Sequence, residues 1–258
     1  MEKIITSTSN PYIKHLKKLQ TSSKYRAEKG TFVLEGQRPV QDAISYGIVP
    51  ESVLISESYK GKIKTDNLYR ISDRVAEFVS DTRTPQGIMA EFKMPKPSAD
   101  GINPEKSPLL FFSDGVSDPG NLGTIVRTLV AAGASGIVLG QGSVDLYNPK
   151  TIRSTMASVF NLPVYNPGDT VTALKMLKNK GYRIVGTRME DAVLYTEANL
   201  TVPTVVVMGN EARGMSEQAM ALCDGFVKIP IEGKIESLNV GVAAAIIAYE
   251  AHRQKGRD

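Results

Sequence analysis

From residue 108 onward, short apolar segments alternate strictly with helical stretches, and this pattern limits the folds open to the chain. The apolar runs are typical of buried strands and lie at residues 108–114, 136–140, 182–188, 204–210 and 226–230. The helical stretches lie near residues 121–133, 148–160, 169–180, 214–222 and 239–254. Strands without a polar face that alternate with helices predict an α/β fold, with a parallel sheet covered by helices on both faces.

The first part of the chain is organised differently. A basic helix near residues 10–29 is followed by a pattern that predicts a strand, a helix and two further strands. Four prolines between Lys93 and Pro108 then indicate a linker. We therefore predict a small N-terminal α/β domain at residues 1–97, a linker at 98–107 and a larger α/β domain at 108–258.

The residue inventory excludes several kinds of site. Cys223 is the only cysteine, so an internal disulfide and a cysteine-built zinc site are both excluded. With only His15 and His252 available, we predict no metal centre and no histidine-based triad. No apolar run approaches the length of a membrane span, and the first residues lack the apolar core of a signal peptide. We therefore expect a cytoplasmic protein without a membrane segment.

Positive charge gathers at the N-terminus. Residues 1–97 carry 16 Lys and Arg against 11 Asp and Glu, whereas residues 98–258 carry 15 against 16. The first 29 residues hold seven basic and two acidic side chains. Such a basic segment is expected of a protein that binds nucleic acid, because phosphate contacts release counterions; a solvated amphipathic helix is the alternative. The candidate RNA contacts are Lys14, Lys17, Lys18, Lys24 and Arg26.

Three loops that follow predicted strands are the places to look for chemistry, since ligands bind at the carboxyl ends of parallel strands. They begin at residues 113, 208 and 229. None carries a usual nucleotide signature: no G-x-G-x-x-G follows a strand, and "GYRIVGTR" lacks the Lys-Ser/Thr of a phosphate loop. No G-x-S-x-G nucleophile elbow is present either.

The same three loops resemble the three ordered motifs of the SpoU (TrmH-like) RNA 2'-O-ribose methyltransferases, a family of the SPOUT class. The motifs read "NLGTIVRT" (121–128), "MGNEARGMS" (208–216) and "IPIEGKIESLNVGVAAAI" (229–246). The N-terminal "STSNPYIKHLKKL" and "FVLEGQRPVQDA" resemble the substrate-binding domain that precedes the catalytic domain in many ribosomal-RNA members.

The resemblance implies an α/β knot, a deep trefoil in which the C-terminal segment threads through a loop. It also implies S-adenosylmethionine as cofactor and a homodimer formed through the C-terminal domain. The implied reaction is 2'-O-ribose methylation of RNA, and the extra N-terminal domain favours large-subunit ribosomal RNA. Three alternatives stay open: the same chemistry on transfer RNA, a methylase that confers antibiotic resistance, and a non-catalytic RNA-binding or ribosome assembly factor. The nucleotide is not specified by the sequence.

The resemblance also assigns residues to the site. Those expected to carry or order the chemistry are Asn121, Arg127, Glu211, Ser237 and Asn239. Those expected to bind the cofactor are Met208, Gly209, Asn210, Ile229 and Leu238. From the residues alone, Asn239 could equally cap the helix that follows it, and Glu211 could be an acid favoured by a helix dipole.

Two features have both a functional and a structural interpretation. Arg127 lies among apolar helix residues, so we expect an anionic partner: an RNA phosphate, the developing alkoxide, or an acidic side chain in a structural ion pair. The final helix begins with Gly241, Ala243, Ala244 and Ala245, which allow close approach at a knot core and a dimer interface. A simple buried helix is the alternative.

Overall fold

The computed structural model describes residues 3–96 and 101–256 and contains two compact units. The N-terminal unit combines the chain up to Pro95 with Asp145–Phe160, and the C-terminal unit contains the remainder. Residues 145–160 thus pack with the N-terminal unit, although the sequence pattern groups them with residues 108–258. Residues 98–100 of the predicted linker lie outside the described residues.

The N-terminal unit is built on a mixed five-stranded sheet in the order β1-β4-β3-β5-β2. Strand β5 runs antiparallel to β2 and β3, and the other pairs are parallel. The elements are β1 (Lys3–Ile5), α1 (Pro11–Thr21), α2 (Ser23–Lys29), β2 (Thr31–Glu35), α3 (Gln37–Ser45), β3 (Ser52–Ser56), β4 (Leu68–Ile71), α4 (Asp73–Val79), β5 (Ile88–Lys93), α6 (Pro149–Thr155) and a 3-10 turn (Ser158–Phe160).

The basic helix predicted near residues 10–29 is two helices. Asn10 caps α1, and Ser22 both ends α1 and caps α2, because its hydroxyl accepts a hydrogen bond from the Tyr25 amide. The side chains of Ile13, Leu16 and Leu19 on α1 are buried against the sheet of the N-terminal unit. Its lysines project from the other faces, as amphipathic spacing requires.

Residues 145–160 complete the aromatic core of the N-terminal unit. The Tyr147 ring lies 4.9 Å from that of Phe32, and the Phe160 ring lies 5.2 Å from that of Phe92. Both phenylalanines of the sheet are fully buried. Residues 145–160 therefore shield the rings of Phe32 and Phe92 from water.

Arg26 corrects an expectation from the sequence. Its side chain is buried, pairs with Asp145, and donates a hydrogen bond of 2.6 Å to the Leu19 carbonyl. A buried charge needs such partners, and removing them would be costly. Arg26 is consequently part of the core of the N-terminal unit and not of its basic surface.

The C-terminal unit contains seven strands, all parallel, in the order β10-β12-β9-β11-β6-β7-β8. Every residue of β6, β7 and β11 is buried. The elements are β6 (Leu109–Asp114), α5 (Pro119–Ala131), β7 (Gly136–Leu139), β8 (Val164–Tyr165), α7 (Thr170–Asn179), β9 (Arg183–Thr187), β10 (Val193–Leu194), β11 (Thr204–Gly209), α8 (Glu217–Met220), β12 (Gly225–Lys228) and α9 (Val240–Lys255).

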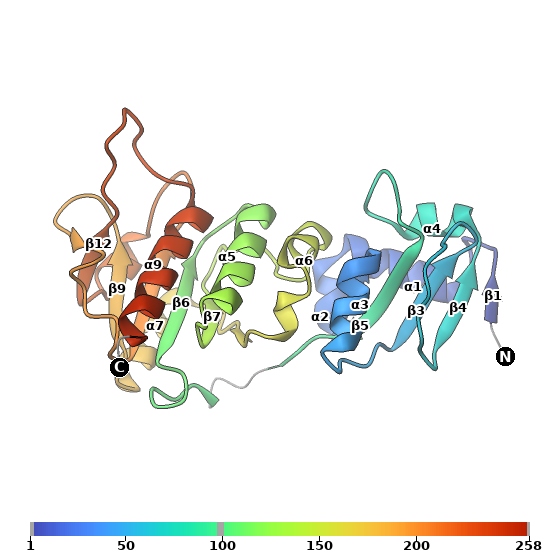
Figure 1. Ribbon diagram of the computed structural model, residues 1–258, viewed down its shortest axis with the longest axis horizontal. Helices are drawn as coiled ribbons and strands as arrows, with labels where there is room; N and C mark the ends of the chain where they lie inside the picture. Colours follow the sequence, from blue (N-terminus) through green and yellow to red (C-terminus); the bar gives the residue numbers. More distant parts are fainter. Residues whose placement is uncertain (1–2, 97–100, 257–258) are drawn as a thin grey trace. The chain divides into compact units, whose positions relative to one another are not determined.

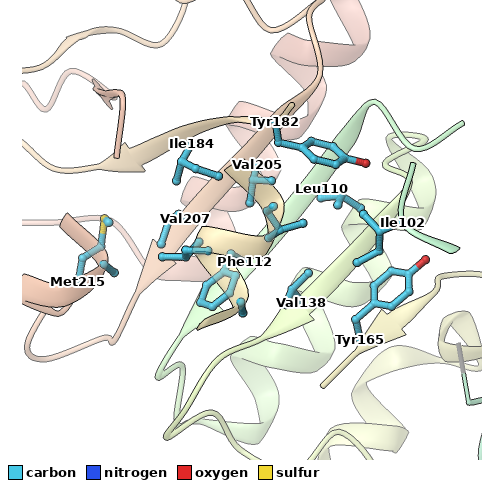
Figure 2. Close-up of a cluster of buried hydrophobic side chains, with 14 residues drawn as sticks. Ile102, Leu110, Phe112, Val138, Tyr165, Tyr182, Ile184, Val205, Val207 and Met215 are labelled. Atoms are coloured by element: carbon cyan, nitrogen blue, oxygen red, sulfur yellow. The ribbon is translucent and has the colours of Figure 1, made fainter. Parts of the chain in front are cut away.

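Helices cover both faces of this sheet, which confirms the predicted α/β architecture. On one face, Leu110 and Phe112 of β6 and Val205 and Val207 of β11 pack with α7 and α8 (Figure 2). Because side chains alternate along a strand, the intervening residues face α5 and α9 on the other side. Helix α9 lies beside α5 and also contacts β11 (Figure 1).

The small residues of α9 allow this close packing. Gly241, Ala244 and Ala248 are buried, and a Cβ added to Gly241 would come within 3.2 Å of the Thr124 side chain on α5. Within residues 3–96 and 101–256, no helix is both long enough and apolar enough to cross a bilayer.

Candidate functional site

A cavity of about 540 Å³ opens at the carboxyl ends of β9, β11 and β12 in the C-terminal unit. Its size suits a small-molecule ligand. The three predicted motifs meet there, as strand ends of one parallel sheet should. Nine of the ten predicted site residues line it: Asn121, Met208, Gly209, Asn210, Glu211, Ile229, Ser237, Leu238 and Asn239.

Glu211 ties the loop after β11 to the loop after β6. One carboxylate oxygen accepts hydrogen bonds from the Ser117 amide and hydroxyl, both at 3.1 Å. The other accepts from the Asp118 amide at 3.1 Å and the Asn121 side-chain amide at 2.9 Å. Burial by itself would raise the pKa of Glu211, but these donors outweigh it and lower the pKa to about 2.

Asn121 and Asn239 continue this network to the last helix. The Asn239 side-chain amide donates a hydrogen bond of 2.8 Å to the Asn121 side-chain oxygen. The Asn239 oxygen accepts from the amides of Gly241 and Val242 and thus caps α9, as the sequence suggested. Asn121 does not cap α5; Asp118 does, at 2.8 Å from the Asn121 amide.

A tight turn presents Glu211 to the cavity. Asn210 and Gly214 exchange backbone hydrogen bonds of 2.8 and 2.9 Å, and the Asn210 side chain holds the Gly115 carbonyl at 2.8 Å. A Cβ on Gly209 would lie only 2.3 Å from backbone atoms of Gly214 and Met215. Glycine is therefore required at position 209 by the turn itself.

Arg127 lies apart from this network. The sequence placed it in an apolar setting, but its side chain is exposed on α5, whereas Ile125, Val126 and Leu129 are buried. Within the described part of the chain, it has no hydrogen-bonding or ionic partner and does not line the cavity. Ser237 is exposed at the cavity wall.

Three residues at the end of β9 also belong to the site, although the sequence motifs do not include them. Thr187, Arg188 and Met189 all line the cavity. The segment "GYRIVGTR" lacks the residues of a phosphate loop, but its last residues lie at the carboxyl end of a predicted strand, and this position was the signal in the sequence that could have identified them. Among the described residues, no group of three or more His, Cys, Asp or Glu side chains could hold a metal ion.

The cavity suits a nucleoside ligand with a charged arm. Met208, Val227, Ile229, Leu238 and Ile247 supply apolar walls, while Glu211, Arg188 and Lys228 supply charge. The Nε atom of Arg188 is buried and, among the described residues, has no hydrogen-bonding partner. Apolar walls with a few placed polar groups are typical of cofactor sites.

Comparison with known proteins shows that the similarity to SpoU methyltransferases extends over nearly the whole chain. The SpoU rRNA Methylase family model matches residues 108–249, and the MRM3-like substrate binding domain model matches residues 10–90. The 23S rRNA (guanosine(2553)-2'-O)-methyltransferase RlmP of Bacillus subtilis is 36% identical over 253 residues, which cover 96% of this chain and 98% of that protein. The 23S rRNA (uridine(2479)-2'-O)-methyltransferase of Streptomyces viridochromogenes is 31% identical, with 89% and 85% covered.

Solved structures agree with the sequence comparison. The SpoU methyltransferase AviRb from Streptomyces viridochromogenes, in complex with the cofactor AdoMet, superposes with a TM-score of 0.87 at 27% identity. The match covers 96% of this chain and 99% of that one. The C-terminal unit accordingly has the SPOUT α/β knot fold that the resemblance implied. With its motifs, fold and family-model match in agreement, the chain belongs to the SpoU rRNA methylase family.

Proposed function

We propose that this protein methylates a ribose 2'-hydroxyl of large-subunit ribosomal RNA with S-adenosylmethionine as the methyl donor. The observation that carries the proposal is the convergence of the three SpoU motifs on one cavity. As a functional division, we propose that residues 1–97 select the RNA and residues 108–258 transfer the methyl group. Matches to a substrate-binding domain and to 23S rRNA methyltransferases favour ribosomal over transfer RNA.

The cofactor would lie against the apolar walls formed by Met208, Ile229 and Leu238, with Gly209 and Asn210 at the turn beside it. When bound, S-adenosylmethionine supplies a methyl group activated by a positively charged sulfur. The residues of the cavity orient the reacting atoms in line and exclude water, which is the main source of rate enhancement in such a displacement.

Glu211 orders the loops and does not take the 2'-hydroxyl proton. A carboxylate with a pKa of about 2, whose two oxygens already accept hydrogen bonds, is a weak base near neutral pH. Its role is to hold Ser117, Asp118 and Asn121 in place beside the cavity. The proton leaves instead to solvent or to a phosphate of the RNA.

Arg127 is proposed to bind the RNA phosphate next to the target ribose. Its guanidinium is exposed, and it has no partner among the described residues of this chain. A guanidinium stays charged and presents donors in a planar fork that matches a phosphate.

We further propose that the protein is a homodimer joined through α9. Val242 and Tyr249, seven positions apart on one face of α9, are 47% and 51% exposed. Ala245 and Ile246, between them, are only half-buried. An apolar stripe of this kind on a helix suits a second copy of the same surface, related by a twofold axis.

On the N-terminal unit, the proposed RNA contacts are Lys14, Lys17, Lys18 and Lys24. Lys14, Lys18 and Lys24 are exposed, and Lys17 is half-buried. Because large-subunit ribosomal RNA is its substrate on this proposal, we place the protein in the cytoplasm.

Two assays on the purified full chain test the proposal. Calorimetry should show binding of S-adenosylmethionine, and unmodified 23S rRNA should accept one methyl group from labelled cofactor. Arg127→Gln should bind the cofactor normally but lose most of the transfer. RNA binding without cofactor binding or transfer would favour the non-catalytic assembly factor instead.

A further inference from the structure

Arg188 occupies a position that none of the three motifs includes. It directly follows β9, and the register places it between the two strands that carry the cofactor motifs. Val207 of β11 pairs with Gly186, and Val227 of β12 pairs with Thr187, so Arg188 lies two positions beyond the last pair with β11 and one beyond the last pair with β12. Its backbone amide donates a hydrogen bond of 3.2 Å to the Val227 carbonyl.

The guanidinium is held in place before any ligand arrives. Its central carbon lies 3.7 Å from the centre of the Phe226 ring, and Nη2 donates a hydrogen bond of 3.2 Å to the Asp191 carbonyl. The Asp191 carboxylate, at 3.8 Å, is 90% exposed and is therefore a weak, screened partner. Nε is buried and therefore out of reach of a ligand, whereas Nη1 makes no hydrogen bond among the described residues. A preorganised guanidinium with spare donors is suited to bind an oxyanion.

The position of Arg188 argues for the cofactor and against the RNA as the source of that oxyanion. The Glu211 network lies at the ends of β6 and β11, and β9 is separated from β6 by β11, about 10 Å across the sheet at the usual strand spacing. Arg188 therefore lies beside the strand ends that carry Met208, Gly209 and Ile229, and two strands away from the Ser117, Asp118 and Asn121 side of the Glu211 network. The other charged groups that line the cavity are Lys228, Glu236 and Glu211.

We propose that Arg188 recognises the carboxylate of the cofactor's amino-acid arm and so selects S-adenosylmethionine over nucleosides that lack that carboxylate. This inference rests on the proposed function, because it assumes that the cavity holds S-adenosylmethionine. It assigns a specificity-determining residue to the strand end that the family motifs leave out.

The test compares two ligands that differ only in the carboxylate: S-adenosylmethionine and its decarboxylated form, both titrated by calorimetry into the full chain. The wild-type protein should bind S-adenosylmethionine at least about 10-fold more tightly. Arg188→Gln should weaken S-adenosylmethionine binding by about 10- to 100-fold, the usual worth of a charge-assisted hydrogen bond. Binding of the decarboxylated form should be unchanged or tighter, since the variant loses a charge that repels this cation.

Three further variants sharpen the comparison. Arg188→Met, which keeps an apolar side chain against Phe226, should give the same ligand selectivity as Arg188→Gln. Arg183→Gln removes a charge from the opposite end of the same strand and should leave both affinities unaltered. Lys228→Gln removes the other cation that lines the cavity and should keep the preference for the carboxylate.

The inference is overturned if the Arg188 variants weaken both ligands equally, or if only Lys228→Gln abolishes the preference. It is also overturned if the Arg188 variants change RNA affinity alone. Failure of the wild-type protein to bind S-adenosylmethionine at all would contradict the proposed function itself. Equal wild-type affinity for the two ligands would contradict only the role of Arg188.

Discussion

Glu211 shows how a single side chain joins two loops that are about 90 positions apart in sequence. Its hydrogen bonds to Ser117, Asp118 and Asn121 all cross between the ends of β6 and β11. Hydrogen bonds to an ionised carboxylate are stronger than hydrogen bonds between neutral groups. The shape of the cavity beside Glu211 thus depends on the negative charge of this residue.

Replacing Glu211 by glutamine should therefore lower turnover with RNA by about 10- to 100-fold, the effect of losing a charge-assisted hydrogen bond. The neutral amide of glutamine has one acceptor oxygen. Its NH₂ group cannot accept hydrogen bonds, so the N–H donors that face it lose their acceptor. Single-turnover methylation measures this effect. Glu217→Gln, which removes an exposed acid from the first turn of α8, is the matched control and should keep full turnover.

The same pair of proteins has a defined pH dependence. The folded pKa of Glu211 is lowered from 4.5 to about 2, so its stabilising effect is fully present above the unfolded pKa and is lost as pH falls toward the folded value. The difference in melting temperature between wild type and Glu211→Gln should be constant from pH 8 to 6 and shrink below about pH 4.5. A difference that changes between pH 6 and 8 would contradict this.

Residue environments were harder to predict from the sequence than residue identities. The motifs gave nine residues that meet at the cavity, but Arg127 and Arg26 have surroundings opposite to those expected. Arg127 is flanked by apolar residues, yet each step along a helix turns about 100°, so it projects away from them. Arg26 is buried by Asp145, which is 119 positions away. Neither orientation follows from local sequence.

Among the elements, helix α9 has two different faces, one packed against the protein and one exposed. Its small residues Gly241, Ala244 and Ala248 face the protein, while Val242 and Tyr249 face outward. A helix with little bulk on the inside and an apolar stripe outside would pack on α5 in one chain and on a second chain beyond it. This arrangement supports the proposed dimer.

Val242→Asp should convert the dimer into a monomer, because it places a charge in an apolar interface that excludes water. Light scattering coupled to size exclusion measures the mass. Val49→Asp changes an 81% exposed valine of the N-terminal unit and should leave the mass at that of wild type. A wild-type protein that runs as a monomer at micromolar concentration would contradict the dimer.

Long apolar runs were the most predictable elements. All five predicted strands of the parallel sheet are present, whereas the two-residue strands β8 and β10 carry too little pattern to be seen. The helix expected over residues 148–160 ends early, because Met156 and Ala157 adopt positive φ angles of 49° and 64°. Non-glycine residues rarely adopt positive φ angles, and methionine and alanine are not residue types that predict them.

At the scale of the whole molecule, the packing of residues 145–160 could not be predicted. They follow β7 in the sequence of the methylase domain, but their aromatic rings and Asp145 complete the N-terminal unit. The knot is likewise a property of the entire chain path, and it entered the prediction through the family resemblance alone. Contacts between distant segments leave no local periodicity.

The charge of the N-terminal unit should govern RNA affinity. Replacing Lys14, Lys18 and Lys24 together by glutamate should weaken binding and reduce the dependence of log affinity on log salt by about 2 to 3, since each lost phosphate contact removes about 0.7–0.9. Filter binding over a salt series measures both. Equivalent changes at the exposed Lys60, Lys62 and Lys64 are the control, and cofactor affinity should not alter in either variant.

Mapping 2'-O-methyl groups in ribosomal RNA from cells with and without this protein tests the central claim most directly. We predict that one ribose of the large-subunit RNA loses its methyl group when the protein is absent and regains it when the wild-type chain, but not Arg127→Gln, is returned. Identical methylation maps in both kinds of cell would contradict the account.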